Sequence, residues 1–161
     1  MPTVPWSPRW RLGERTAFEA LGEVMTVEPA GRLYRSLVET KKATSVQNWT
    51  LVPHDPGPII FFAQTPVGEP TGPVKDALLT TLYDVKNAPI TQAEVDRVRA
   101  KYLKAVDQTL NDPQQFGIEL SNWIALGDWR LYFLNRDRWR KLSAVDVQRV
   151  ALDHRQPAGA G

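Results

Sequence analysis

The sequence has no cysteine and only two histidines among its 161 residues. The absence of cysteine excludes a disulfide framework, a thiolate metal site and a cysteine nucleophile. The longest strongly apolar run covers residues 58–63, far short of the ~20 residues that a membrane-spanning helix needs. Charge is also nearly balanced, because 20 basic and 18 acidic side chains leave a net +2, without the basic stripe of a dedicated nucleic-acid-binding protein.

The composition is that of a folded domain, with 42% hydrophobic and 24% charged residues. A length of 161 residues fits one domain. Prolines at positions 2, 5 and 8 block regular hydrogen bonding, so residues 1–13 are predicted to be irregular, and they carry no apolar region of a secretory signal. Residues 14–154 are predicted to form the domain, and residues 155–161 a disordered tail.

Hydrophobic periodicity predicts helices on both sides of a strand pair. Apolar residues recur at helical spacing over residues 14–25, and the pattern beyond residue 73 is again helical. Residues 44–52 alternate with period two, residues 59–63 form a short apolar run, and turn formers separate them. The order predicts an α+β fold with helices on one face of a small antiparallel sheet. Because two strands alone are marginal in water, we expect an unpaired sheet edge or an uncovered apolar patch.

Capping signals place three of the later helices, through the pairs Thr91 with Glu94, Asp112 with Pro113, and Ser143 with Asp146. Two hydrophobic staples flank these caps, Ile90 with Val95 and Leu142 with Val147. Gly127 is predicted to be a left-handed cap in a turn between helices. Residues predicted to be buried in this region are Phe116, Leu120, Trp123, Ile124, Trp129, Leu131, Tyr132, Leu134 and Trp139.

The segment from Gly31 to Leu37 is predicted to begin a helix at the glycine. Leu33 and Leu37 have the spacing of core residues. Arg32 and Arg35 are expected to be solvated or to pair locally.

The search for catalytic or metal-binding patterns is mostly negative. His54 and His154 are the only histidines, and neither lies in a His-x-x-Glu-His or His-Glu-x-x-His sequence. Zinc needs about three converging protein ligands, so we predict no metal, cofactor-binding or catalytic residue in this chain. His54 and Asp55 could form a hydrolytic triad with Ser45, but the dense turn formers favour an exposed histidine and an aspartate that caps its own turn. No nucleophile-elbow, dinucleotide-binding or Walker sequence occurs.

A basic and aromatic cluster occupies residues 129–141. Its basic members are Arg130, Arg136, Arg138, Arg140 and Lys141, and its aromatic members are Trp129, Tyr132, Phe133 and Trp139. Such alternation occurs in proteins that bind single-stranded nucleic acid. Acidic residues within and beside the cluster favour instead a solvated helix face. Nucleic-acid binding is therefore the weakest of the alternatives, and we expect no nucleic-acid partner.

Five segments, in order, resemble the second-half domain of insulinase/pitrilysin-type zinc metallopeptidases, and the bacterial members most of all. They are residues 31–40, 88–96, 110–113, 127–130 and 143–151, within a resemblance that covers roughly residues 14–152. The resemblance implies an α+β domain with a curved antiparallel sheet and helices on one face. Domains of this family pair, within one chain or between subunits, to enclose a peptide-degrading chamber.

Three features depart from the family pattern. The zinc motif, His-x-x-Glu-His with a later glutamate, is absent, so no catalytic or metal-ligating residue carries over. Residues 58–63 also lack the arginine and tyrosine with which some partner domains hold the substrate backbone. Strands expected before the first helix and after the last are missing, so the chain resembles a domain trimmed at both ends.

The resemblance therefore implies a non-catalytic domain or fragment, inactive alone, that forms chamber wall and a docking surface for a zinc-bearing partner domain. The zinc belongs to that partner, and peptide substrate is met through the assembled chamber. An alternative from another class is an independent protein-interaction module.

Overall fold

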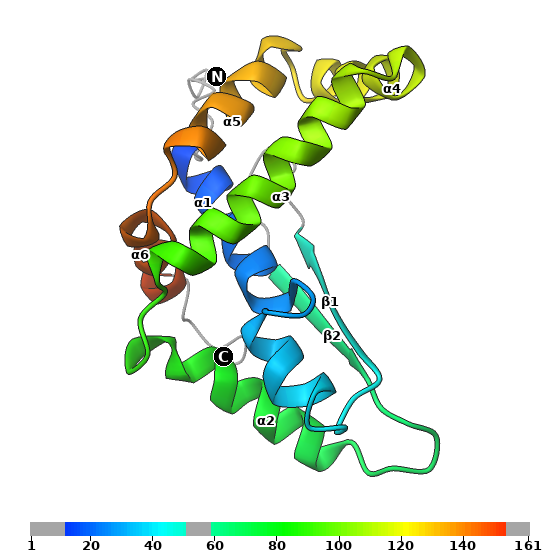
Figure 1. The fold of residues 1–161 in the computed structure, drawn as a ribbon, viewed down its shortest axis with the longest axis vertical. Coiled ribbons are helices and arrows are strands. Elements are labelled where there is room, and N and C mark those ends of the chain that lie inside the picture. The colour runs from blue at the N-terminus through cyan, green and yellow to red at the C-terminus, as the bar shows by residue number, and fades with distance from the viewer. Residues whose placement is uncertain (1–11, 51–58, 154–161) are drawn as a thin grey trace, which may run out of the picture.

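The structure, a computed structural model, describes residues 12–50 and 59–153. Its elements are α1 (Leu12–Thr26), the π-helix η1 (Tyr34–Val38), β1 (Ser45–Thr50), β2 (Ile59–Gln64), α2 (Gly72–Tyr83), the 3₁₀ helix η2 (Asp84–Lys86), α3 (Gln92–Leu110), α4 (Pro113–Ala125), α5 (Arg130–Lys141) and α6 (Ala144–Asp153). The predicted α+β fold is confirmed, with one antiparallel pair of strands among the described residues. Figure 1 shows the hairpin beside α1, α3 crossing α1, and α2 at the opposite end from α4 and α5.

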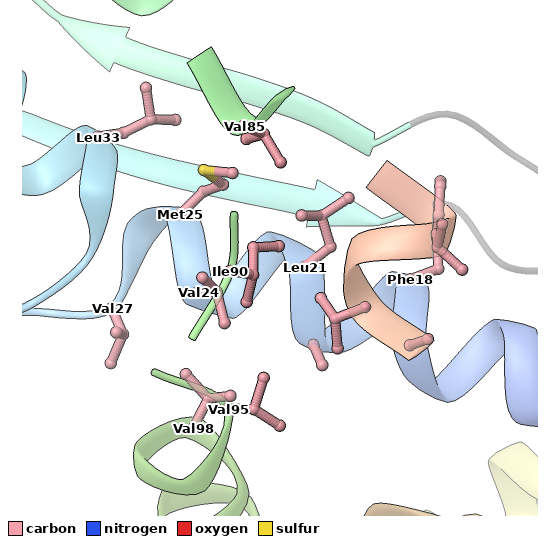
Figure 2. Packing of buried hydrophobic residues seen from close by; sticks show 14 of the residues in the cluster. Phe18, Leu21, Val24, Met25, Val27, Leu33, Val85, Ile90, Val95 and Val98 are labelled. Carbon is pink, nitrogen blue, oxygen red and sulfur yellow. The ribbon is translucent and has the colours of Figure 1, made fainter. Parts of the chain in front are cut away.

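Helix α1 supplies the centre of the core. Its apolar residues lie on one side at helical spacing and pack against β1, α3, α5 and α6. Figure 2 shows this packing, in which Met25 of α1 lies toward the strands and Leu33, and Val24 lies on the side of Val95 and Val98 of α3. Each large apolar side chain removed from water in this way stabilises the fold by about 1.5–3 kcal/mol.

The hairpin turns one face toward this core and the other away from it. Val46 lies opposite Ala63, and Asn48 opposite Phe61, in the antiparallel register. Because side chains alternate along a strand, Val46, Phe61 and Ala63 share the face that packs on the core. Helix α1 and η1 contact β1, so the helices hold the sheet mainly through its first strand.

The segment after Gly31 is helical, as predicted, but it forms a π-helix instead of an α-helix. The backbone N–H of Glu39 donates to the Tyr34 carbonyl, five residues back, at 3.2 Å. The Thr40 hydroxyl donates to the Ser36 carbonyl at 2.7 Å. This carbonyl lies within the wider turn of the π-helix, so the side chain supplies it with a hydrogen bond. Leu33 and Leu37 are fully buried, as their spacing predicted.

The predicted caps are confirmed at all three helix starts. Thr91 and Glu94 form both bonds of a capping box, and the Asp112 carboxylate accepts from two backbone N–H groups of α4. The Ser143 hydroxyl donates to Asp146 at 2.6 Å, and the Asp146 N–H donates back to it at 3.3 Å. Both hydrophobic staples are buried. Gly127 has a positive φ of 115°, as a left-handed cap requires.

Three of the predicted core residues are exposed. Trp129 is 49% exposed, and Leu134 and Ile124 also face solvent, so assigning them to the core was wrong. The reason is that α4 and α5 each bury only one stripe of side chains. Where these two helices meet α3 they form a second, smaller core of Val106, Trp123 and Tyr132, and α5 also packs on α1.

Arg32 is also placed differently from the prediction, because it pairs with a distant part of the chain. Its Nε and Nη2 donate to the two carboxylate oxygens of Glu94 at 2.7 and 2.8 Å. The same guanidinium donates to the carbonyls of Ala88 and Pro89. A planar donor fork suits such a two-oxygen pairing, and it ties the segment before η1 to the start of α3.

The ion pair between Arg32 and Glu94 makes the free energy of unfolding depend on pH. Burial raises the pKa of Glu94, but hydrogen bonds from Arg32 and Thr91 outweigh it and lower the pKa from 4.5 to about 2. A folded-state pKa below the unfolded value stabilises the protein above about pH 4.5, and this contribution disappears as the pH falls toward 2.

We expect Glu94→Gln to lower the free energy of unfolding by about 2 kcal/mol at pH 7 in urea titrations. The deficit should shrink toward zero in acid, and a deficit constant with pH would contradict this assignment.

Candidate functional site

The described residues contain no group of three or more His, Cys, Asp and Glu side chains that could hold a metal ion. A zinc site needs about three such ligands converging on one point. Residues 12–50 and 59–153 therefore do not fit the zinc centre of the resembling family, and no chemical step of this chain is assigned to a metal.

Of the three residues considered for a hydrolytic triad, only Ser45 lies in the described structure. Ser45 begins β1, and its hydroxyl donates to the Gln64 side chain across the hairpin at 3.5 Å. His54, Asp55 and His154 lie outside the described residues.

The basic cluster of α5 is largely ion-paired with its neighbours. Arg130 pairs with Asp128 at 2.8 Å, and Arg136 and Arg140 share Asp137. The hydrogen bond from Arg130 lowers the pKa of Asp128. Trp139 of this cluster belongs to the core and is 1% exposed, so it cannot stack on a nucleobase. No helix in the described part of the chain is long and apolar enough to cross a bilayer.

The second face of the hairpin carries an exposed apolar patch. Trp49 is 58% exposed and Phe62 is 51% exposed. By the register, Trp49 lies opposite Ile60, and Phe62 lies opposite Gln47, on the side of the sheet away from α1. We call these four residues the open face. Water-exposed aromatic side chains gathered on one surface are typical of a protein contact.

A recess of about 340 Å³ lies beside the last residues of β1, and it is bounded by α1, α3 and α5. Its lining comprises Glu19, Glu23, Asn48, Trp49, Thr50, Val98, Lys101, Tyr102, Ala105 and Trp139. We call it the β1 recess. The rings of Tyr102 and Trp139 stack in it, with centroids 4.3 Å apart and planes at 13°.

The two carboxylates of the β1 recess come from one side of α1. Glu19 and Glu23 are four residues apart, which places them on the same helix face. Glu23 Oε2 pairs with Lys101 Nζ at 2.8 Å, in a half-exposed ion pair. Glu19 Oε1 accepts from Arg15 at 2.9 Å. Among the described residues, Glu19 Oε2 accepts longer bonds from Trp139 Nε1 at 3.4 Å and from Asn135 Nδ2 at 3.5 Å.

A network of buried polar side chains lies beneath the β1 recess. Thr16 donates to Asn135 Oδ1 at 2.8 Å, and Asn135 Nδ2 donates to the Tyr102 hydroxyl at 3.2 Å. Burial raises the pKa of Tyr102, and the nearby negative charge of Glu19 raises it further, so the phenol stays protonated. The network joins residues more than thirty positions apart in α1, α3 and α5, and no local pattern in the sequence marks it. The one local signal is the four-residue spacing of Glu19 and Glu23 on α1.

Comparisons with known proteins bear on the family and the fold. Residues 1–102 match the family model described as the peptidase M16 inactive domain. The structure of a proposed zinc protease from Bordetella pertussis Tohama I is 38% identical, with a TM-score of 0.78 over 88% of this chain and 78% of that chain. The inactive peptidase domain of a proposed zinc protease from Bordetella parapertussis is 37% identical, with a TM-score of 0.79 over 95% of this chain and 79% of that chain.

A third structure, a protease from Helicobacter pylori, shares the fold at 18% identity. Its TM-score is 0.79 over 88% of this chain and 34% of that chain. No curated protein sequence matches the chain.

Proposed function

Because the chain belongs to the peptidase M16 inactive domain family, we propose that it is the non-catalytic partner of a zinc-bearing domain in a peptide-degrading protease. In this role the chain contributes chamber wall and a docking surface, while the zinc-bearing domain supplies the metal and the activated water. The described residues offer no ligand set for zinc, which fits a division of labour between two domains.

The open face is the observation that best supports docking of this chain to a zinc-bearing domain. In the part of the chain that the structure describes, the helices pack on one side of the hairpin, and Trp49 and Phe62 are about half exposed on the other side. Large aromatic side chains dominate the free energy of protein interfaces, since each buries a large apolar area at a small cost in conformational entropy. We therefore assign the open face to the contact with the zinc-bearing domain.

The proposal predicts that Phe62→Ser weakens binding to a zinc-bearing partner domain of the M16 family. Loss of an aromatic anchor costs about 2 kcal/mol or more, so the Kd should rise by at least about thirtyfold in isothermal titration calorimetry. Val67→Ser is the matched control, because Val67 is fully exposed in the loop after β2 and lies outside the open face. Both variants should keep the circular dichroism spectrum of the parent chain.

Two results would count against the proposal. Equal affinity of Phe62→Ser and the parent chain would remove the open face from the interface. Absence of any complex with the zinc-bearing domain would favour the alternative of an independent interaction module.

A further inference from the structure

The outer edge of β2, the side turned away from β1, has no backbone partner among the described residues. β1 is the only described strand that pairs with β2, in a register that runs without interruption from Ser45 opposite Gln64 to Thr50 opposite Ile59. Helix α1 and η1 lie against β1, and no described helix lies along β2 in the same way. Each residue of β2 also keeps part of its surface exposed. Figure 1 shows the hairpin at the margin of the molecule, with the helices to one side of it.

One carbonyl shows which backbone groups reach this outer edge. The Gln64 carbonyl accepts from the Thr44 N–H at 2.7 Å, so the backbone groups of Gln64 point toward β1. Successive residues of a strand point these groups to opposite sides. The residues that direct N–H and C=O groups to the outer edge are therefore Ile59, Phe61 and Ala63, and no described residue bonds to them there. Unpaired groups of this kind are available to another strand.

The sequence of β2 lacks the features that keep an edge strand from pairing. Ile-Ile-Phe-Phe-Ala-Gln contains no charged residue, proline or glycine, and no bulge interrupts its register with β1. Edge strands that stay unpaired usually carry lysine, proline or a bulge. An uncharged strand of β-branched and aromatic residues is suited to pairing with an identical strand, whereas a charged peptide would find no opposite charge on β2.

Two copies of β2 are complementary when they run antiparallel about a two-fold axis at Phe61. The opposed pairs are then Phe61 with Phe61, Ile59 with Ala63, and Ile60 with Phe62. The first two pairs bring together the outward-pointing N–H and C=O groups, as an antiparallel ladder requires. All the pairs are apolar, and aromatic and β-branched side chains are favourable neighbours across strands. Both the backbone and the side chains of this edge therefore match a second copy of the same chain.

We propose that this chain forms a symmetric dimer in which the outer edges of β2 from two copies pair as antiparallel strands. The pairing is closed, because each copy uses the same edge and the two-fold axis leaves neither edge free. The inference goes beyond the proposed docking function, since the dimer uses the edge of β2 and docking uses the open face. A monomeric chain would leave the docking proposal intact.

Sedimentation equilibrium of the full chain measures this association. A single pair of strands makes a small interface, so we expect a Kd on the order of 100 µM. The weight-average mass should therefore rise from 18.2 kDa toward twice that value as the concentration increases.

Substitution of Ala63 tests whether the edge of β2 forms the contact. Ala63→Pro should raise the Kd of the dimer by at least about tenfold, because it removes an N–H that points to the outer edge. Proline is tolerated in an edge strand where its missing N–H would face outward, so the pairing with β1 should remain. Ala63→Gly is the matched control, since it also alters the strand but keeps the N–H. Circular dichroism should show that both variants are folded.

Hydrogen exchange followed by NMR tests the same contact without a substitution. When the concentration rises from about 50 µM to about 1 mM, the chain passes from mostly monomer to mostly dimer. The amides of Ile59, Phe61 and Ala63 should then exchange at least about fivefold more slowly, as expected for N–H groups that become paired. The amides of Ile60 and Phe62 point toward β1, and their exchange rates should change less.

The proposal is overturned if the chain remains monomeric at about 1 mM, the scale of very weak binding. It is also overturned if Ala63→Pro and Ala63→Gly dimerise alike, because self-association would then use another surface. Equal protection of inward-pointing and outward-pointing amides of β2 would contradict it as well.

Discussion

Replacing Gly31 by alanine is expected to lower the free energy of unfolding by about 3 kcal/mol or more, because the new methyl group has no space. A β-carbon there would lie 2.7 Å from the Met25 carbonyl oxygen and 2.7 Å from the Val27 backbone nitrogen. Both neighbours are backbone atoms, so this steric overlap can be removed only by moving the end of α1 relative to η1. Urea unfolding monitored by tryptophan fluorescence measures the loss.

Gly117→Ala is the control for this substitution. Gly117 lies inside α4, and nothing stands within 4 Å of the position of its missing β-carbon. Alanine should therefore stabilise the protein by about 0.5–1 kcal/mol through its higher helix propensity. We expect the free energy of unfolding to fall for Gly31→Ala and to rise for Gly117→Ala. A small decrease for Gly31→Ala would show that the backbone after α1 can shift at little cost and would contradict the expected steric overlap.

Trp139→Ala should have the largest effect of any single side-chain truncation in this chain. Trp139 is 1% exposed, is the largest fully buried side chain among residues 12–50 and 59–153, and stacks on Tyr102. Truncation leaves a cavity between α1, α3 and α5 and removes a contact to Glu19, at a cost of about 3–5 kcal/mol. Because small domains have only about 5–15 kcal/mol of stability in total, the midpoint of urea unfolding should fall sharply.

Trp129→Ala provides the comparison with the same change of side chain. Trp129 is 49% exposed and touches Phe133 edge-on, so its loss should cost less than about 1 kcal/mol. Similar losses at the two tryptophans would mean that α5 is packed differently from the arrangement described.

Local features of this fold are predictable from the sequence, because their causes are local. Thr91, Asp112 and Ser143 cap helices with bonds that span two or three residues, and the hairpin follows from period-two alternation between turn formers. The family resemblance is likewise confirmed, because it depends on the order of five segments.

Features that depend on distant partners are not predictable in this way. Arg32 has the pattern of a solvated residue, yet it pairs with Glu94, 62 positions away. Trp129 and Trp139 have similar aromatic surroundings in the sequence, and only the packing of α5 on α1 and α3 decides that Trp139 is buried. The π-helix at η1 follows no periodicity that distinguishes it from an α-helix.

The same division holds for the candidate site. The expectation of an uncovered apolar patch follows from counting strands, and the exposed Trp49 and Phe62 match it. The β1 recess could not be predicted, because its carboxylates, rings and strand edge come from four elements. Only the fold brings Glu19 to Tyr102 and Trp139.

The most direct test of the account is peptide hydrolysis by a zinc-bearing partner domain of the M16 family, measured with a fluorogenic peptide in the presence and absence of this chain. The account predicts no turnover by this chain with added zinc, little by the zinc-bearing domain alone, and a clear gain when the two are mixed, with a smaller gain for Phe62→Ser. Zinc-dependent turnover by this chain alone would contradict it.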